Sequence, residues 1–299
     1  MRWKRGRRSG NVEDRRGDGP HLGASAAPAL LRIVPVLLRS KVGRIILIGG
    51  VVVIFGGQLL GLNTLSLLTG EQPGYSQSVP RQAAGDEEMV DFVSAVLGDT
   101  EQTWQQYFAQ MQRKYAYPTL VLFTGSVRSA CGQASAAVGP FYCPGDQKLY
   151  LDLSFFQDLA QRHGAPGDFA QAYVIAHEVG HHVQTLLGIS KQVQQAGEGR
   201  SKAEINALSV RQELQADCFA GIWGHAASRQ RQMLDPGDLE EALLAASSIG
   251  DDRLQREAGG AVVPDSFTHG TSAQRMRWFK AGFETGDLNA CDTFSAEHL

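Results

Sequence analysis

Three residues, His177, Glu178 and His181, have the types and spacing of a hydrolytic metal site. They form a His-Glu-x-x-His pattern, and residues four apart lie on the same face of a helix. Two imidazoles placed in this way can bind one metal ion, and the carboxylate beside them can take a proton from a metal-bound water. By composition alone the pattern arises by chance in roughly one chain in a hundred of this length, so further ligands must be found.

A pair of acidic residues further along the chain can supply the remaining ligand. A catalytic zinc site takes three protein ligands and keeps one position open for water. Glu213 and Asp217 are four residues apart in an otherwise apolar segment, so both carboxylates point to one side of a helix. We expect Glu213 to bind zinc and Asp217 to hold a ligand histidine through its free ring N–H. The alternative, a solvated acidic face, fits the apolar surroundings poorly, because buried carboxylates need partners.

The remaining histidines are weaker candidates for ligands. His182 is one residue off the ligand face, so we expect a structural or exposed role. His225 lies twelve residues past Glu213, roughly 120° around the same helix. The expected cofactor is one zinc ion. Ferrous oxygenases also use two histidines and a carboxylate, but they do not need a base at the position of Glu178.

A small β layer and several helices must position these residues. Residues 119–123 and 148–153 have the composition of strands. The motif helix is expected from Asp168, as its N-terminal cap, to about Leu187, with Gly188 as its stop. Other expected helices and loops are an 86–97 helix ended by Gly98, a 100–114 helix, a 154–162 helix, a mobile 188–200 loop, a 202–229 helix carrying Glu213, a 236–256 helix and a 272–284 helix.

The N-terminal part of the chain is basic, and the remainder is acidic. Residues 1–44 carry 11 Lys and Arg against 3 Asp and Glu, whereas the remainder is acidic. We interpret 1–44 as a disordered basic tail, with nucleic-acid binding as the less favoured alternative. The acidic remainder excludes nucleic acid as the main partner, because such a partner requires a basic surface.

An uncharged segment, residues 45–68, follows the basic tail and is long enough to cross a bilayer once. A buried core helix and a cleaved signal peptide are the alternatives to an uncleaved anchor. The basic residues just before it place the tail in the cytoplasm. Residues 69–85 are then a linker, and residues 86–299 are an extracytoplasmic domain, periplasmic or extracellular.

Four cysteines lie in that domain. Cys131 and Cys143 bracket a short loop, so we expect a disulfide between them. Cys218 and Cys291 could form a second disulfide. The alternative, Cys218 as a zinc ligand, is disfavoured because this residue is off the face that carries Glu213.

The motifs together resemble the neutral zinc metallopeptidase family of bacterial membrane-anchored proteins. The resemblance rests on His-Glu-Val-Gly-His-His-Val-Gln, on Glu-Leu-Gln-Ala-Asp-Cys, on Gly-Pro-Phe-Tyr-Cys-Pro and on His-Gly-Thr-Ser-Ala-Gln-Arg, within residues 86–295. It implies an α+β, mostly helical, thermolysin-like zincin. In such a fold a small twisted sheet packs on the motif helix, and the helix with the third ligand crosses behind.

The resemblance implies hydrolysis of peptide or protein substrates. Glu178 would act as general base toward a zinc-activated water. His269 is the candidate for stabilising the oxyanion, and its alternative role is to cap the following helix. Arg275 could share that role or pair with an acidic residue. A zinc-stabilised scaffold without turnover and a zinc hydrolase of non-peptide substrates are the competing functions.

Overall fold

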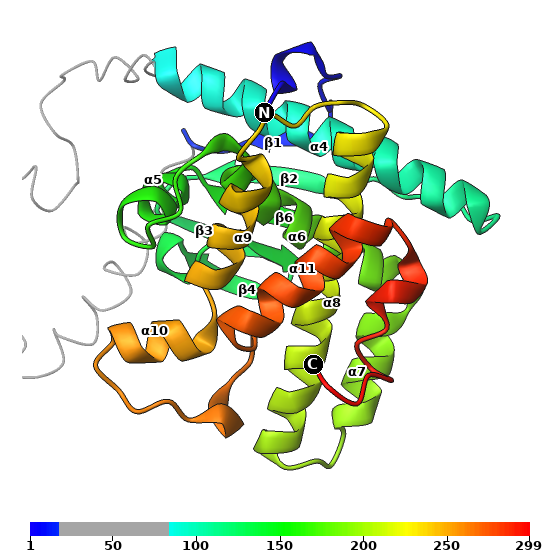
Figure 1. Ribbon diagram of the computed structural model, residues 1–299. Coiled ribbons are helices and arrows are strands. Elements are labelled where there is room, and N and C mark those ends of the chain that lie inside the picture. Colours follow the sequence, from blue (N-terminus) through cyan, green and yellow to red (C-terminus); the bar gives the residue numbers. More distant parts are fainter. Residues whose placement is uncertain (18–83) are drawn as a thin grey trace, which may run out of the picture. The chain divides into compact units, whose positions relative to one another are not determined.

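The computed structural model of the protein describes residues 1–17 and 84–299. The predicted anchor, 45–68, and almost all of the predicted linker, 69–85, lie outside these residues. Within the described part, no helix is both long and apolar enough to cross a membrane. This part is α+β and mostly helical, as predicted (Figure 1).

A four-stranded sheet forms one side of the domain, with its strands in the order β1-β2-β6-β5. Strand β2 pairs in parallel with both β1 and β6, and β5 is antiparallel to β6. The strands predicted at 119–123 and 148–153 are β2 and β6, correct to within one residue. The strands are β1 (Val12–Asp14), β2 (Thr119–Phe123), β5 (Phe141–Cys143) and β6 (Lys148–Asp152), and a separate hairpin is formed by β3 (Ser126–Ser129) and β4 (Gly132–Ser135).

Helices make up the rest of the domain. They are α4 (Ala84–Gln110), α5 (Ser154–Gln161), α6 (Asp168–Leu187), α7 (Ile189–Gly197), α8 (Lys202–Arg229), α9 (Asp238–Ser248), α10 (Asp251–Glu257) and α11 (Ser272–Thr285), with short 3-10 turns η1 (Trp3–Arg5), η2 (Ala136–Val138), η3 (Pro264–Ser266) and η4 (Leu288–Cys291). The motif helix α6 ends at Gly188, whose φ of +84° favours glycine, as predicted.

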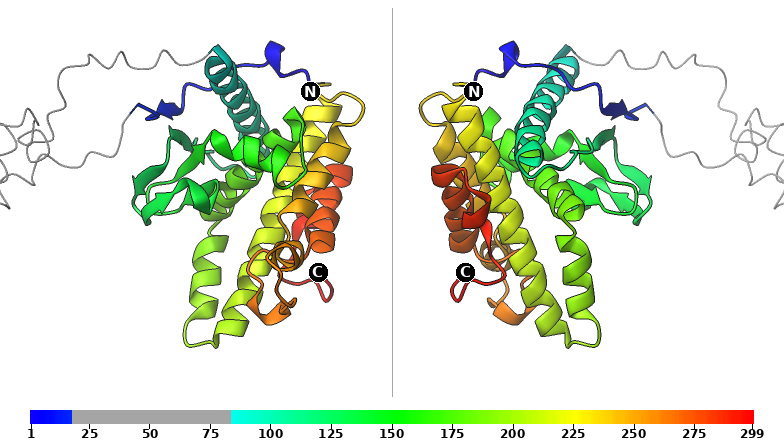
Figure 2. Two further views of the ribbon diagram at one scale, coloured as in Figure 1. Left: turned by 90° about the vertical axis from the view of Figure 1, so that its left-hand side faces the viewer. Right: turned by 90° about the vertical axis from the view of Figure 1, so that its right-hand side faces the viewer.

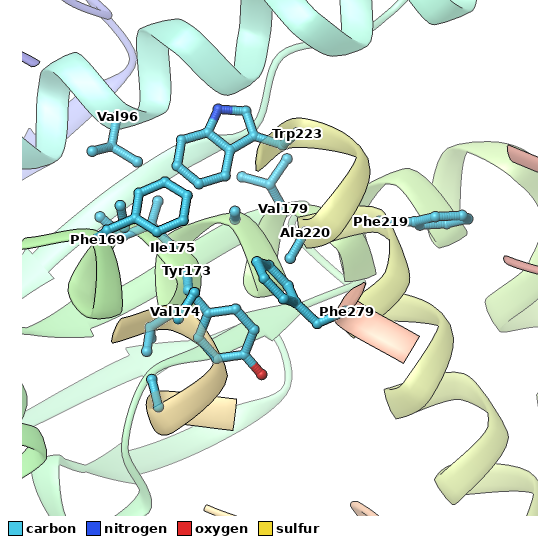
Figure 3. Close-up of a cluster of buried hydrophobic side chains, with 14 of the residues drawn as sticks. Val96, Phe169, Tyr173, Val174, Ile175, Val179, Phe219, Ala220, Trp223 and Phe279 are labelled. Atoms are coloured by element: carbon cyan, nitrogen blue, oxygen red, sulfur yellow. The ribbon is translucent and has the colours of Figure 1, made fainter. Parts of the chain in front are cut away.

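Helix α6 lies at the centre of the domain, between the sheet and helix α8 (Figures 1 and 2). Its neighbours bury it almost completely, and the Phe169 ring stacks on Trp223 with centroids 5.5 Å apart (Figure 3). The two helices approach most closely at Gly180, where an added Cβ would lie 2.9 Å from the Ala216 carbonyl oxygen. This close packing brings the two predicted ligand segments together.

Three predicted elements differ from the structure. Helix α4 is continuous and is not interrupted at Gly98, because that glycine is a packing site within the helix. The predicted mobile loop at 188–200 is mostly helix α7, which packs against α8. The predicted 236–256 helix is two helices, α9 and α10, separated where Gly250 has extended backbone (φ −72°, ψ 140°). Ser272 also approaches Gly250 too closely for a side chain there.

The prediction that residues 1–44 form a disordered tail is wrong for residues 1–17. These residues pack on the domain: Trp3 is buried, and β1 forms the edge of the main sheet beside β2 (Figure 1). The residues that contact this segment lie more than eighty positions away in the chain, so the local composition of residues 1–17 could not predict these contacts. The rest of the predicted tail lies outside the described residues.

Candidate metal centre

The three predicted zinc ligands converge at one point between helices α6 and α8. Nε2 of His177 lies 3.1 Å from a carboxylate oxygen of Glu213, and Nε2 of His181 lies 3.4 Å from the other oxygen. The two imidazole rings are perpendicular, with centroids 4.8 Å apart. Helical spacing places the histidines one turn apart, and the α6–α8 contact adds the carboxylate from 36 residues away in the sequence.

Asp217 orients His177, as predicted from its spacing to Glu213. A carboxylate oxygen of Asp217 lies 2.8 Å from Nδ1 of His177, so Nδ1–H donates to it and Nε2 faces Glu213. The Asp217 side chain is completely buried. A carboxylate on the second nitrogen of a ligand histidine fixes the ring and its tautomer, which is the usual arrangement around zinc.

Arg275 compensates for the buried charge of Asp217. Its Nε and Nη2 donate to the two carboxylate oxygens at 2.9 and 3.0 Å, and Nη2 also contacts the hydroxyl of Tyr173 at 3.1 Å. Of the two roles predicted for Arg275, the structure shows the pairing with an acidic residue. Tyr173 was not predicted, although its position four residues before His177 places it on the same helical face.

A second set of hydrogen bonds orients His181. Oε1 of Gln184 lies 2.9 Å from Nδ1 of His181, and Nε2 of Gln184 donates to the Gln212 carbonyl at 2.7 Å and to Oε1 of Gln215 at 3.1 Å. Gln215 in turn donates to the Cys291 carbonyl at 3.1 Å. This relay was not predicted, although Gln184 follows His181 by three residues and is therefore its neighbour on the helix.

Electrostatics at the site favour a cation between the ligands. Burial lowers the pKa of His177, but the Asp217 carboxylate outweighs burial and raises that pKa to about 10. Burial raises the pKa of Glu213, whereas the two histidines lower it further, to well below its usual range. For Asp217, Arg275 overcomes the effect of burial, and the pKa falls to about 2. The pocket thus holds carboxylates as anions and stabilises positive charge beside them.

The donor set and its spacing fit zinc. Two imidazole nitrogens and one carboxylate form a common catalytic zinc site. Zinc–ligand distances of about 2.0–2.2 Å in a tetrahedron place neighbouring ligand atoms about 3.3–3.6 Å apart. The ligand atoms of His177, His181 and Glu213 all lie within 4.8 Å of one another, so small adjustments suffice to hold one ion.

The site opens into a cavity of about 760 Å³. Glu178 lines this cavity beside His181, as its predicted role requires. One wall comes from strand β5 and the loop before it, with Val138 66% exposed. Residues of α8 and His269 also line the cavity, together with the three candidate ligands.

His269 borders the same cavity, and Asp251 holds it. The Nδ1 of His269 lies 3.2 Å from one Asp251 oxygen. The other Asp251 oxygen accepts from the backbone N–H groups of Thr268, His269 and Gly270 at 2.6–3.1 Å. The hydrogen bond with Asp251 raises the pKa of the half-exposed His269 and outweighs the partial desolvation that lowers this pKa. The helix-capping alternative for His269 is wrong, because Thr271 caps α11.

The other histidines lie apart from the ligands. His182 is completely buried and structural: its ring contacts the Tyr142 hydroxyl at 3.1 Å and the Ala116 carbonyl at 2.7 Å. His225 contacts the Phe283 carbonyl at 2.8 Å. Both are therefore occupied with protein partners, in agreement with the prediction that neither is a ligand.

Both expected disulfides are present. Cys131 bonds to Cys143 with a Cα–Cα distance of 5.8 Å, and Cys218 bonds to Cys291 with a Cα–Cα distance of 5.6 Å. The alternative of Cys218 as a zinc ligand is thereby excluded. The second disulfide ties the C-terminal segment to α8 beside the relay that orients His181.

Comparisons with known proteins agree with this geometry. The family described as "Putative neutral zinc metallopeptidase" matches residues 1–294 and thus includes the N-terminal segment. The chain is 49% identical over 296 residues to the uncharacterized protein YpfJ of Escherichia coli (strain K12), covering 98% of this chain and 99% of that protein. It is 42% identical over 238 residues to the uncharacterized protein Mb2605 of Mycobacterium bovis, covering 76% of this chain and 78% of that protein. No solved structure matches the chain. The chain belongs to the family described as "Putative neutral zinc metallopeptidase".

Proposed function

We propose that the protein is a zinc-dependent peptidase that hydrolyses peptide bonds in the cleft above His177, His181 and Glu213. The observation that carries this proposal is the convergence of these three side chains at the bottom of a cavity that Glu178 also lines. A scaffold without turnover would need the ligands but not the additional carboxylate. Membership of the family supports the same conclusion.

In this proposal His177, His181 and Glu213 hold the ion, and Asp217 and Gln184 keep the two imidazoles aimed at it. A bound zinc ion lowers the pKa of water toward neutrality and polarises a carbonyl group. Glu178 accepts the proton of the attacking water and delivers it to the leaving amine. The Glu178 carboxylate has no hydrogen-bond partner in the described part of the chain, so it is available to accept a proton from water.

His269 is the proposed donor to the developing oxyanion. Contacts with Asp251 and with the hydroxyl of Thr268 both involve Nδ1, which leaves Nε2 for the substrate. The raised pKa of His269 favours the doubly protonated ring, and a charged donor stabilises an oxyanion more strongly than a neutral one. Asp251 would be a positioning residue, because it acts through the histidine.

An extended peptide suits the wall of the cavity that is formed by β5. This strand is the last of the four-stranded sheet, and Phe141 and Tyr142 line the cavity. A sheet edge can bind a peptide backbone by adding a strand. We therefore propose peptides or proteins as substrates, bound alongside β5, in a thermolysin-like arrangement of sheet, motif helix and third-ligand helix.

The two disulfides support a location of the domain outside the cytoplasm, because such bonds persist in oxidising compartments. We propose a periplasmic or extracellular catalytic domain on a membrane-bound chain. The predicted anchor at 45–68 lies outside the described residues and stays a prediction.

The decisive experiment compares the wild-type protein with Glu178→Gln on casein and on a peptide library. Glu178→Gln keeps the side-chain size and removes the base, so we expect zinc to bind as in the wild type and peptide cleavage to fall by at least 100-fold. Equal cleavage by both proteins would exclude the mechanism. Zinc binding by a wild-type protein that cleaves no peptide would favour the scaffold, and cleavage of esters alone would favour a non-peptide hydrolase.

A further inference from the structure

The first seventeen residues form an integral part of the domain surface. Strand β1 pairs in parallel with β2, with Val12 opposite Leu120 and Asp14 opposite Leu122. The Trp3 side chain is only 7% exposed, and its ring packs edge-on against Phe92 of helix α4 with centroids 5.4 Å apart. The segment thus supplies both a strand to the sheet and an aromatic side chain to the core.

A buried carboxylate in helix α4 depends on this segment for all its hydrogen bonds. Glu101 is 1% exposed. One of its oxygens accepts from the Ser9 hydroxyl and from Nδ2 of Asn11, each at 2.6 Å, and the other pairs with Arg7. Without residues 7–11, this carboxylate would have no partner in the described part of the chain, and an unpaired buried charge is strongly unfavourable.

A glycine in the same helix makes room for the segment. An added Cβ at Gly98 would lie 2.7 Å from the Arg7 carbonyl oxygen and 3.0 Å from the Ser9 backbone nitrogen. Gly98 is inside the continuous helix α4, where glycine costs about 1 kcal/mol relative to alanine. The close approach of the N-terminal backbone gives a physical reason for a glycine at this position.

The α-amine of Met1 reaches the start of the motif helix. It donates to both carboxylate oxygens of Asp168, the first residue of α6, at 2.7 and 2.8 Å, and lies 3.5 Å from Asp238. Carboxylate oxygens of Asp168, Asp238 and Glu241 lie within 4.8 Å of one another. Glu241 accepts from the Phe169 N–H at 3.0 Å and so caps α6 from another helix. The ammonium group supplies the positive charge that this acidic cluster needs.

We propose that the catalytic domain is completed by its own N-terminal segment, residues 1–17, and that residues 1–17 and 84–299 therefore occupy the same side of any membrane. Strand pairing between β1 and β2 requires both strands in one compartment. A single crossing between Gly17 and Ala84 would separate them.

This proposal changes the topology expected from the sequence. A cytoplasmic N-terminus and an extracytoplasmic domain would require the N-terminal contacts to be absent in the mature protein. With both on one side, a single membrane crossing by the predicted anchor at 45–68 is incompatible with the pairing of β1 and β2.

Thiol labelling of the full chain in spheroplasts tests the topology. The four native cysteines form disulfides, so added cysteines are the reactive thiols of the described part. Gly10→Cys and Gln194→Cys place one thiol on each part, at exposed positions, and a side chain at residue 10 meets nothing within 4 Å. We expect a membrane-impermeant maleimide to label both variants before lysis, or both only after lysis. Labelling of one before lysis and of the other only after it would overturn the proposal.

Discussion

The Asp217 carboxylate joins His177 to Arg275: it accepts from Nδ1 of the imidazole at 2.8 Å and from the guanidinium at 2.9 and 3.0 Å. One buried anion thereby orients a ligand and is neutralised by a cation from helix α11. The motif that contains Arg275 is thus coupled to the motif that contains His177. The site is therefore assembled from three helices, and each can be tested separately.

Asp217→Asn should weaken zinc binding without removing a ligand. The amide can still accept from Nδ1 of His177, but it lacks the charge that makes the imidazole more basic and that compensates Arg275. We expect a loss of about 10–100-fold in zinc affinity, measured by competition with a chromophoric chelator. Asp265→Asn, at an exposed aspartate, is the control. Equal zinc affinity in the wild type and Asp217→Asn would show that the carboxylate does not tune the site.

Gln184→Ala should loosen the second histidine ligand. The substitution removes the acceptor for Nδ1 of His181 and leaves the Gln212 carbonyl and Gln215 without their partner. Zinc affinity should fall by about 10–100-fold, with a larger effect on kcat than on KM for peptide cleavage. The matched control is Gln194→Ala on the exposed face of α7. If both variants retain wild-type affinity, the relay has no part in holding the ligand.

Removal of the metal should both destabilise the domain and stop cleavage. A ligand at 100 times its Kd adds about 2.7 kcal/mol to the free energy of unfolding, and a chelator removes that contribution. Calorimetry with and without chelator measures the change, and re-addition of zinc should reverse it. Glu213→Ala should contain much less zinc by metal analysis and should show no further shift with chelator. Unchanged zinc content in this variant would remove Glu213 from the ligand set.

The two disulfides should differ in how much each adds to the free energy of unfolding. Cys218 and Cys291 close a separation of 73 residues, and Cys131 and Cys143 one of 12. The loop-entropy relation gives about 4 kcal/mol for the long loop and about 3 kcal/mol for the short one. Replacing each pair by alanine and following thermal unfolding should reveal this order. Removing Cys218–Cys291 should also lower cleavage, because it frees the Cys291 carbonyl that accepts from Gln215. A reversed order of stability would contradict the loop argument.

The sequence alone predicted which residues form the candidate metal site, and the structure brings them together. Spacing of four residues places His177 and His181 on one helical face, and the same rule pairs Glu213 with Asp217, because helical neighbours are set by local geometry. The boundaries of α6, α8 and β2 followed from apolar patterns and, at the C-terminal end of α6, from Gly188. Asp168, the predicted N-terminal cap of α6, is instead its first residue, and Gly167 is the cap. The disulfide between Cys131 and Cys143 followed from a short separation.

Only the tertiary structure decided which distant residues meet. Residues 1–17 have the composition of a solvated basic tail, yet Glu101 and Asp168 hold them in place across the chain. Gly98 would be a helix stop by local rules, but in the folded domain it is the place where another backbone crosses α4. Such contacts depend on packing between elements that are far apart in the sequence. Neither the hydrophobic periodicity nor the composition of one segment can predict them.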